Sequence, residues 1–159
     1  MKPLLDKFFL GLAFLILAVP AVAFGASDAD MEILAKKLKA DKKLLVAINM
    51  VLTEDEAKDF WPLYDEYQKE LQTVNHELGR LVVEFAEAYV EAPIPNDTAM
   101  KIRNDVLALE EKEVQLKKTY GDKMDKVLPA WKVTRYLQIE NKIRALIKFE
   151  LAKRIPLTY

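Results

Sequence analysis

The chain has 159 residues, of which 52% are hydrophobic and 31% are charged, and its formal net charge at pH 7 is -1. This balance is typical of one ordinary folded domain and gives no indication of a nucleic-acid partner. The sequence contains no cysteine, which excludes disulfides and thiolate metal sites.

The first 25 residues have the composition of a secretory signal peptide. MKPLLDK carries two lysines, the run FFLGLAFLILAVPAVA has no charge, and residues 21–25 offer small side chains for cleavage. A membrane anchor is the alternative, but the apolar run has roughly 16 residues and contains Pro20, whereas a spanning helix needs about 20. No cysteine follows the run, which excludes a lipoprotein anchor. We therefore expect residues 1–25 to be a signal peptide and residues 26–159 to be one domain in the periplasm of a Gram-negative bacterium.

The rest of the chain predicts an all-α fold. No segment alternates with a period of two for long, and only two glycines, Gly79 and Gly121, lie beyond residue 25. Turn signals at residues 49–53, 92–97 and 128–129 separate four expected helices, at about residues 30–48, 54–90, 98–127 and 129–153. The expected architecture is a long bent helical hairpin with shorter N- and C-terminal helices.

A capping box begins the second expected helix, in the stretch LTEDEAKDFWPLYDEY. The Thr53 hydroxyl is expected to accept a hydrogen bond from the amide of Glu56, and the Glu56 carboxylate to accept one from the amide of Thr53. Three consecutive acidic residues in this first turn also suit the helix dipole. Leu52, Thr53 and Glu56 therefore define a helix-start motif.

An apolar seam with a proline follows this motif. Spacings of four and three residues connect the members of the seam, which are Phe60, Tyr64, Tyr67, Leu71, Val74, Leu78, Leu81 and Phe85. Pro62 removes one backbone hydrogen bond and clashes with the carbonyl four residues back, so we expect a helix bend at Trp61 and Pro62. The aromatic residues of this stretch either fill one end of the core or form a partly open aromatic surface.

Charge is segregated between the expected helices. Residues 54–91 contain eleven acidic and three basic residues, whereas residues 129–159 contain seven basic and two acidic residues. One explanation is that the acidic second helix lies beside the basic fourth helix, in one bundle or across a dimer. The other is that the fourth helix presents a basic binding surface.

The helical wheel of the fourth helix favours a specific surface. Its main apolar stripe consists of Tyr136, Ile139, Ile143, Leu146 and Ile147. Trp131 and Phe149 fall together off this stripe, flanked by Arg135, Lys142 and Lys153. Aromatic rings among cations can receive acidic or aromatic segments of a partner, although packing against the first helix would explain the same two rings. The candidate client or partner surface is therefore Trp131, Arg135, Lys142 and Phe149.

The sequence offers no catalytic or metal motif. His76 is the only histidine, and there is no nucleophile arrangement, glycine-rich phosphate loop or HExxH. Glu110, Glu111 and Glu113 lie near lysines, which predicts a solvated helix face rather than paired catalytic carboxylates. Zinc needs three or four ligands, which His76 alone cannot supply, although a dimer could bring two copies of His76 together with Glu77. A haem-binding helical bundle is not indicated either, because the sequence has no CxxCH motif. We expect no enzymatic activity, no cofactor and no metal.

The motif Leu52-Thr53-Glu54-Asp55-Glu56 resembles the LTxxQ motif of the Spy/CpxP group of small periplasmic helical proteins. The longer patterns DKKLLVAINMVLTEDEAKDFWPLYDEYQ and VLPAWKVTRYLQIENKIRALIKFELAKRIPL are similar to a poorly characterised set of secreted proteobacterial proteins attached to that group. Glu56 replaces the glutamine of the motif, and Leu128-Pro129-Ala130-Trp131-Lys132 stands where the group often has a second copy.

The resemblance implies a non-enzymatic, cradle-shaped dimer that holds unfolded envelope proteins or takes part in stress signalling. A holdase would bind several unrelated unfolded clients. A signalling adaptor would bind one folded partner, such as a sensor domain. A metal-associated helical stress protein is a further alternative within the same group.

The signal peptide predicts a defined mature N-terminus. Expressed whole in a bacterial host, the protein should be released by osmotic shock as a species that begins between Phe24 and Ser27, because the apolar run is too short to remain as an anchor. N-terminal sequencing of the released fraction checks this. Retention in the inner membrane with Met1 or Lys2 intact would contradict it.

Overall fold

A computed structural model describes residues 40–90 and 93–158 of the chain. Residues 40–50 are helical, and three long helices follow, α3 (Glu54–Val90), α4 (Asn96–Met124) and α5 (Ala130–Ala152). The described part contains no strand, so the all-α prediction is confirmed. The expected signal peptide lies outside the described residues. Within residues 40–90 and 93–158, no helix combines the length and apolarity needed to cross a membrane.

The helix bounds differ from the expected ones by a few residues, except in α3. α4 begins two residues earlier than expected, directly after Pro95. It ends at Met124 and is followed by a turn at residues 125–127, in which the amide of Val127 donates to the carbonyl of Met124 at 3.0 Å. Pro129 is the N-cap of α5 rather than its first residue. Local turn chemistry therefore fixes where each helix ends.

The start of α3 has the expected capping box. The amide of Thr53 donates to Glu56 Oε2 at 2.8 Å, and the amide of Glu56 donates to Thr53 Oγ1 at 3.3 Å. Pro62 lies inside α3, and the helix continues on both sides of it up to Val90. A bend at Trp61 and Pro62 stays a prediction.

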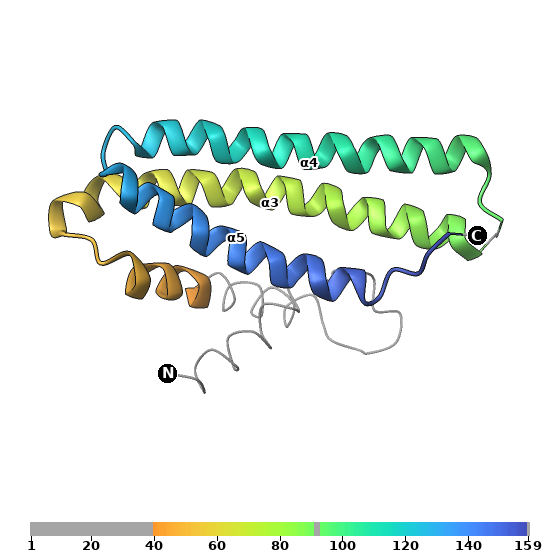
Figure 1. Ribbon diagram of the computed structural model, residues 1–159, viewed down its shortest axis with the longest axis horizontal. Helices are drawn as coiled ribbons and strands as arrows, with labels where there is room; N and C mark the ends of the chain where they lie inside the picture. The colour runs from red at the N-terminus through yellow and green to blue at the C-terminus, as the bar shows by residue number, and fades with distance from the viewer. Residues whose placement is uncertain (1–39, 91–92, 159) are drawn as a thin grey trace.

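α3 and α4 form a long antiparallel hairpin (Figure 1). Three ion pairs connect the two helices along their length, and the residue numbers rise on one helix as they fall on the other. The pairs are Glu84 with Lys101 at 2.6 Å, Glu77 with Lys112 at 2.6 Å, and Glu66 with Lys123 at 3.5 Å. The acidic residues of α3 therefore form ion pairs mainly with lysines of α4. They form fewer with α5 than the segregation of charge suggested.

α5 runs back across α3, and the helix at residues 40–50 packs beside both (Figure 1). Lys42 Nζ lies 2.8 Å from Glu140 of α5 and 2.8 Å from Gln68 of α3. Val46 and Met50 of the same short helix are completely buried. The short helix is therefore anchored by several polar contacts of its lysines and by two buried apolar side chains.

Aromatic rings fill the core at the α3 N-terminal end. Phe60 and Tyr136 meet edge to face with ring centroids 5.3 Å apart, and Tyr67 and Tyr120 do so at 5.5 Å. Tyr64 is also buried, and Trp61 is half-buried against the cluster. Of the two alternatives for this stretch, the core is the observed one. Burial raises the pKa of Tyr64 and Tyr67.

The cap of α3 also holds the start of α5. Lys132 is 7% exposed, and its Nζ donates to Glu56 Oε2 and, at 3.2 Å, to the carbonyl of Val51. Val51 has a positive φ of 49°, which turns the chain between the short helix and α3. Glu56 therefore caps one helix and neutralises a buried cation of another, which a glutamine cannot do.

Glu56→Gln should preserve the cap yet lower the free energy of unfolding at pH 7, because it leaves the Lys132 ammonium buried without a counter-charge. The hydrogen bond from Lys132, followed by that from the Thr53 amide, holds the pKa of Glu56 below its ordinary value of 4.5. A lowered folded-state pKa stabilises the protein above the unfolded-state pKa, and this stabilisation is lost as the pH falls through the folded-state pKa.

Urea unfolding of wild type and Glu56→Gln at neutral and acidic pH measures this difference. The gap between the two proteins should be fully present at pH 7, should narrow as the pH falls below about 4.5, and should close below the folded-state pKa of Glu56. Thr53→Ala is the control, because it removes an uncharged cap and should cost about 1 kcal/mol at either pH. A difference in the free energy of unfolding that does not change with pH would show that the charge of Glu56 does not stabilise the fold.

Candidate partner-binding site

The outward face of α5 carries all four residues of the expected surface. Trp131 and Phe149 are 58% and 61% exposed, and Arg135 and Lys142 are exposed between them. Residues 18 positions apart are separated by five full helical turns, so the two rings share one face about 27 Å apart. α5 thus places the four side chains on one line without bringing the rings into contact.

Cations accompany both rings. Lys132 Nζ lies 5.3 Å from the ring centroid of Trp131, and Lys153 Nζ lies 5.5 Å from that of Phe149. The ion pairs of α5 use Lys132, Arg144, Lys148 and Lys153. Within the described part of the chain, Arg135 and Lys142 form none, so their charges face solvent. Packing on the described part of the first helix does not explain the two rings, since both stay exposed.

The inward face of α5 sets this orientation. Its buried apolar residues are Val133, Tyr136, Ile143, Ile147 and Leu151. Ile139 and Leu146, which were expected in the apolar stripe, are half-buried. Val133 and Leu151 extend the stripe to both ends of the helix, and Trp131 and Phe149 remain on the opposite side.

Glu140 is a buried carboxylate within this inward face. It is 3% exposed and accepts hydrogen bonds from Lys42 Nζ at 2.8 Å and from Gln68 Nε2 at 2.9 Å. The Gln68 amide also donates to the hydroxyl of Tyr136 at 3.1 Å. Glu140 therefore connects α5 to both α3 and the short helix.

Glu113 corrects one sequence expectation. Glu110 and Glu111 lie on an exposed face as expected, but Glu113 is only 4% exposed. Arg144 Nη2 lies 2.6 Å from Glu113 Oε2, and Lys117 Nζ lies 2.7 Å from Glu113 Oε1. Burial by itself raises the pKa of Glu113, but the hydrogen bonds from Lys117 and Arg144 outweigh it and lower that pKa. Both oxygens are held by cations, so this carboxylate connects helices and is not a free base.

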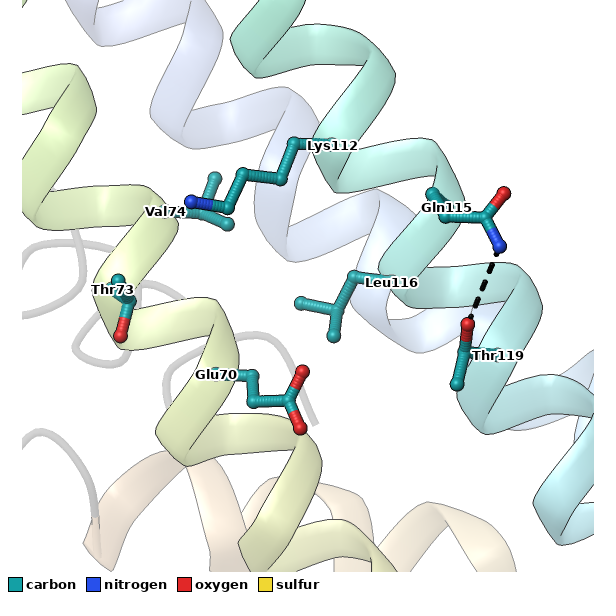
Figure 2. A pocket seen from close by; sticks show the side chains of 7 residues that line it. All are labelled: Glu70, Thr73, Val74, Lys112, Gln115, Leu116 and Thr119. Carbon is teal, nitrogen blue, oxygen red and sulfur yellow. Dashed lines mark hydrogen bonds between the residues drawn. The ribbon is translucent and has the colours of Figure 1, made fainter.

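A shallow groove lies between α3 and α4 (Figure 2). Its volume is about 340 Å³, and its lining residues are Glu70, Thr73, Val74, Lys112, Gln115, Leu116 and Thr119. Several of its polar groups are already engaged, since Glu70 accepts a hydrogen bond from the Tyr120 hydroxyl at 2.7 Å and Lys112 pairs with Glu77. The sequence did not indicate this groove, because its residues come from two helices and share no motif.

The described residues include no group of three or more His, Asp or Glu side chains arranged to hold a metal ion. His76 is exposed on α3. No protein-family model, curated protein or solved structure matches the chain. The fold and the surface therefore define a class only: an all-α protein in which a helical hairpin is crossed by a third long helix with an aromatic, basic outer face.

Exposed and buried rings should respond very differently to truncation. Trp131→Ala and Phe149→Ala should each change the free energy of unfolding by less than about 0.5 kcal/mol, because both rings are largely in solvent. Phe60→Ala should cost about 3–5 kcal/mol, because Phe60 is completely buried. Urea unfolding of the three variants measures this. A loss for Trp131→Ala as large as that for Phe60→Ala would show that Trp131 is part of the core.

Proposed function

We propose that the protein is a Spy/CpxP-like periplasmic chaperone that binds unfolded envelope proteins and has no enzymatic activity. One observation carries this proposal, namely two large aromatic side chains exposed on one face of α5. Exposed apolar patches rimmed by polar residues mark interaction sites, and aromatic rings supply much of the contact area in such sites.

The charges on the same face suit unfolded clients. Arg135 and Lys142 lie between the rings and have no ion-pair partner in the described part of the chain. Cations on a rim mainly accelerate encounter with acidic segments, while the rings hold apolar ones. A line of separated contacts about 27 Å long fits an extended segment, which can place its side chains at variable spacing.

A signalling adaptor that binds one folded sensor domain is the second candidate. The observation that favours it is the fixed spacing of the two rings on a single rigid helix, to which one complementary surface can be matched. The two functions differ in the number of partners that the α5 face accepts.

An aggregation assay with several unrelated unfolded clients separates the two functions. The mature protein should suppress aggregation at near-stoichiometric amounts, and Trp131→Ala/Phe149→Ala should lose most of that protection. Leu44→Ala is the matched control, because Leu44 is 57% exposed but belongs to the short helix. It should protect as the wild type does.

Raising the salt concentration from about 50 mM to about 300 mM shortens the Debye length from roughly 14 Å to roughly 6 Å and should slow the capture of acidic clients. Protection that survives the double substitution would place the binding surface elsewhere. Saturable binding of one envelope protein without protection of the others would identify an adaptor.

A further inference from the structure

The outward edge of α4 carries an apolar stripe that the proposed function does not use. Met100, Leu107 and Val114 are 48%, 52% and 64% exposed. They follow one another at intervals of seven residues, and each step of seven turns an α-helix by only about 20° from its starting face. α4 is the helix at the edge of the hairpin, with α3 on its inner side (Figure 1).

Arg103 and Glu111, two charges of opposite sign, flank Leu107 symmetrically. Arg103 precedes Leu107 by four residues and Glu111 follows it by four, and both are exposed. Within residues 40–90 and 93–158 neither belongs to an ion pair, and the Arg103 guanidinium donates only to Asn104 Oδ1 at 3.2 and 3.3 Å. Other charges of α4, such as Lys101 and Lys112, do have partners.

The sequence of this face is self-complementary about Leu107. In an antiparallel pair of α4 helices with a two-fold axis at Leu107, each Met100 opposes the Val114 of the second copy. Each Arg103 opposes the Glu111 of the second copy, so the axis creates two ion pairs and three apolar layers. A parallel pair opposes Arg103 with Arg103 and Glu111 with Glu111, and is therefore disfavoured by like charges.

We propose that this face of α4 is the homodimer interface, formed by a second copy of the chain in antiparallel orientation with the two-fold axis at Leu107. The apolar layers supply the affinity, since burial of apolar surface drives association. The ion pairs fix the direction and the register. The interface lies on a different helix from the candidate client surface, so loss of the dimer and loss of client binding can be distinguished.

Charge exchange tests the pairing. Sedimentation of the mature protein should show a dimer, and Arg103→Glu or Glu111→Arg should each raise the dissociation constant about tenfold or more, because each creates two like-charge contacts. The double variant Arg103→Glu/Glu111→Arg exchanges the two charges and should restore the wild-type constant. Lys126→Glu is the control, because Lys126 is exposed in the turn between α4 and α5.

Single cysteines test the geometry, because the chain has no cysteine of its own. Under mild oxidation Leu107→Cys should form a disulfide-linked dimer, since this residue meets its own copy at the axis. Met100→Cys should not, because its two copies lie about 21 Å apart along the paired helices. A mixture of Met100→Cys and Val114→Cys should cross-link.

Three results would overturn the proposal. The first is a wild-type protein that stays monomeric. If Leu107→Asp then lowers the thermal midpoint of this monomer, another segment of the same chain covers the α4 face. The second is a double charge variant that is as weak as the single ones. The third is cross-linking of Met100→Cys as efficient as that of Leu107→Cys, which would indicate parallel pairing.

Discussion

Charged side chains on the inward face of α5 determine how the helices fit together. Lys132, Glu140 and Arg144 are all less than 10% exposed, and each is held by a residue of another helix. A buried charge without its partner is strongly destabilising, so α5 can neither slide nor rotate on the hairpin without breaking several contacts at once. An apolar core tolerates replacement of one side chain by another of similar volume. The buried ion pairs, in contrast, are satisfied in only one register of α5 against the hairpin.

The same pairs explain why the outer face of α5 is basic. Residues 129–159 contain only two acidic residues. Glu140 turns inward to Lys42, and Glu150 pairs with Lys153. No acidic side chain of α5 is therefore left to neutralise Arg135 and Lys142. The register that satisfies the buried charges places Trp131 and Phe149 in solvent, so core and surface of this helix follow from one constraint.

Features that depend on local sequence could be predicted, and those that depend on pairing between helices could not. The start of α3 and both hydrogen bonds of its cap follow from residues within one turn. The outward position of Trp131 and Phe149 follows from the period of a single helix. The burial of Glu113 does not, because one of its two cations, Arg144, comes from α5. Its position four residues after Leu109 and three before Leu116 was the available signal, since it places a carboxylate within an apolar stripe.

The two exposed faces differ in whether they can pair with themselves. The α5 face carries cations and aromatic rings but no unpaired acid, so a second copy of it would oppose Arg135 and Lys142 with like charges. The α4 face carries Arg103 and Glu111 at equal distances from Leu107, which is the symmetry that an isologous contact requires. The proposed dimer through α4 would leave both α5 faces free. Two lines of aromatic and basic contacts per assembly would let one client engage both copies, which increases avidity without any new contact.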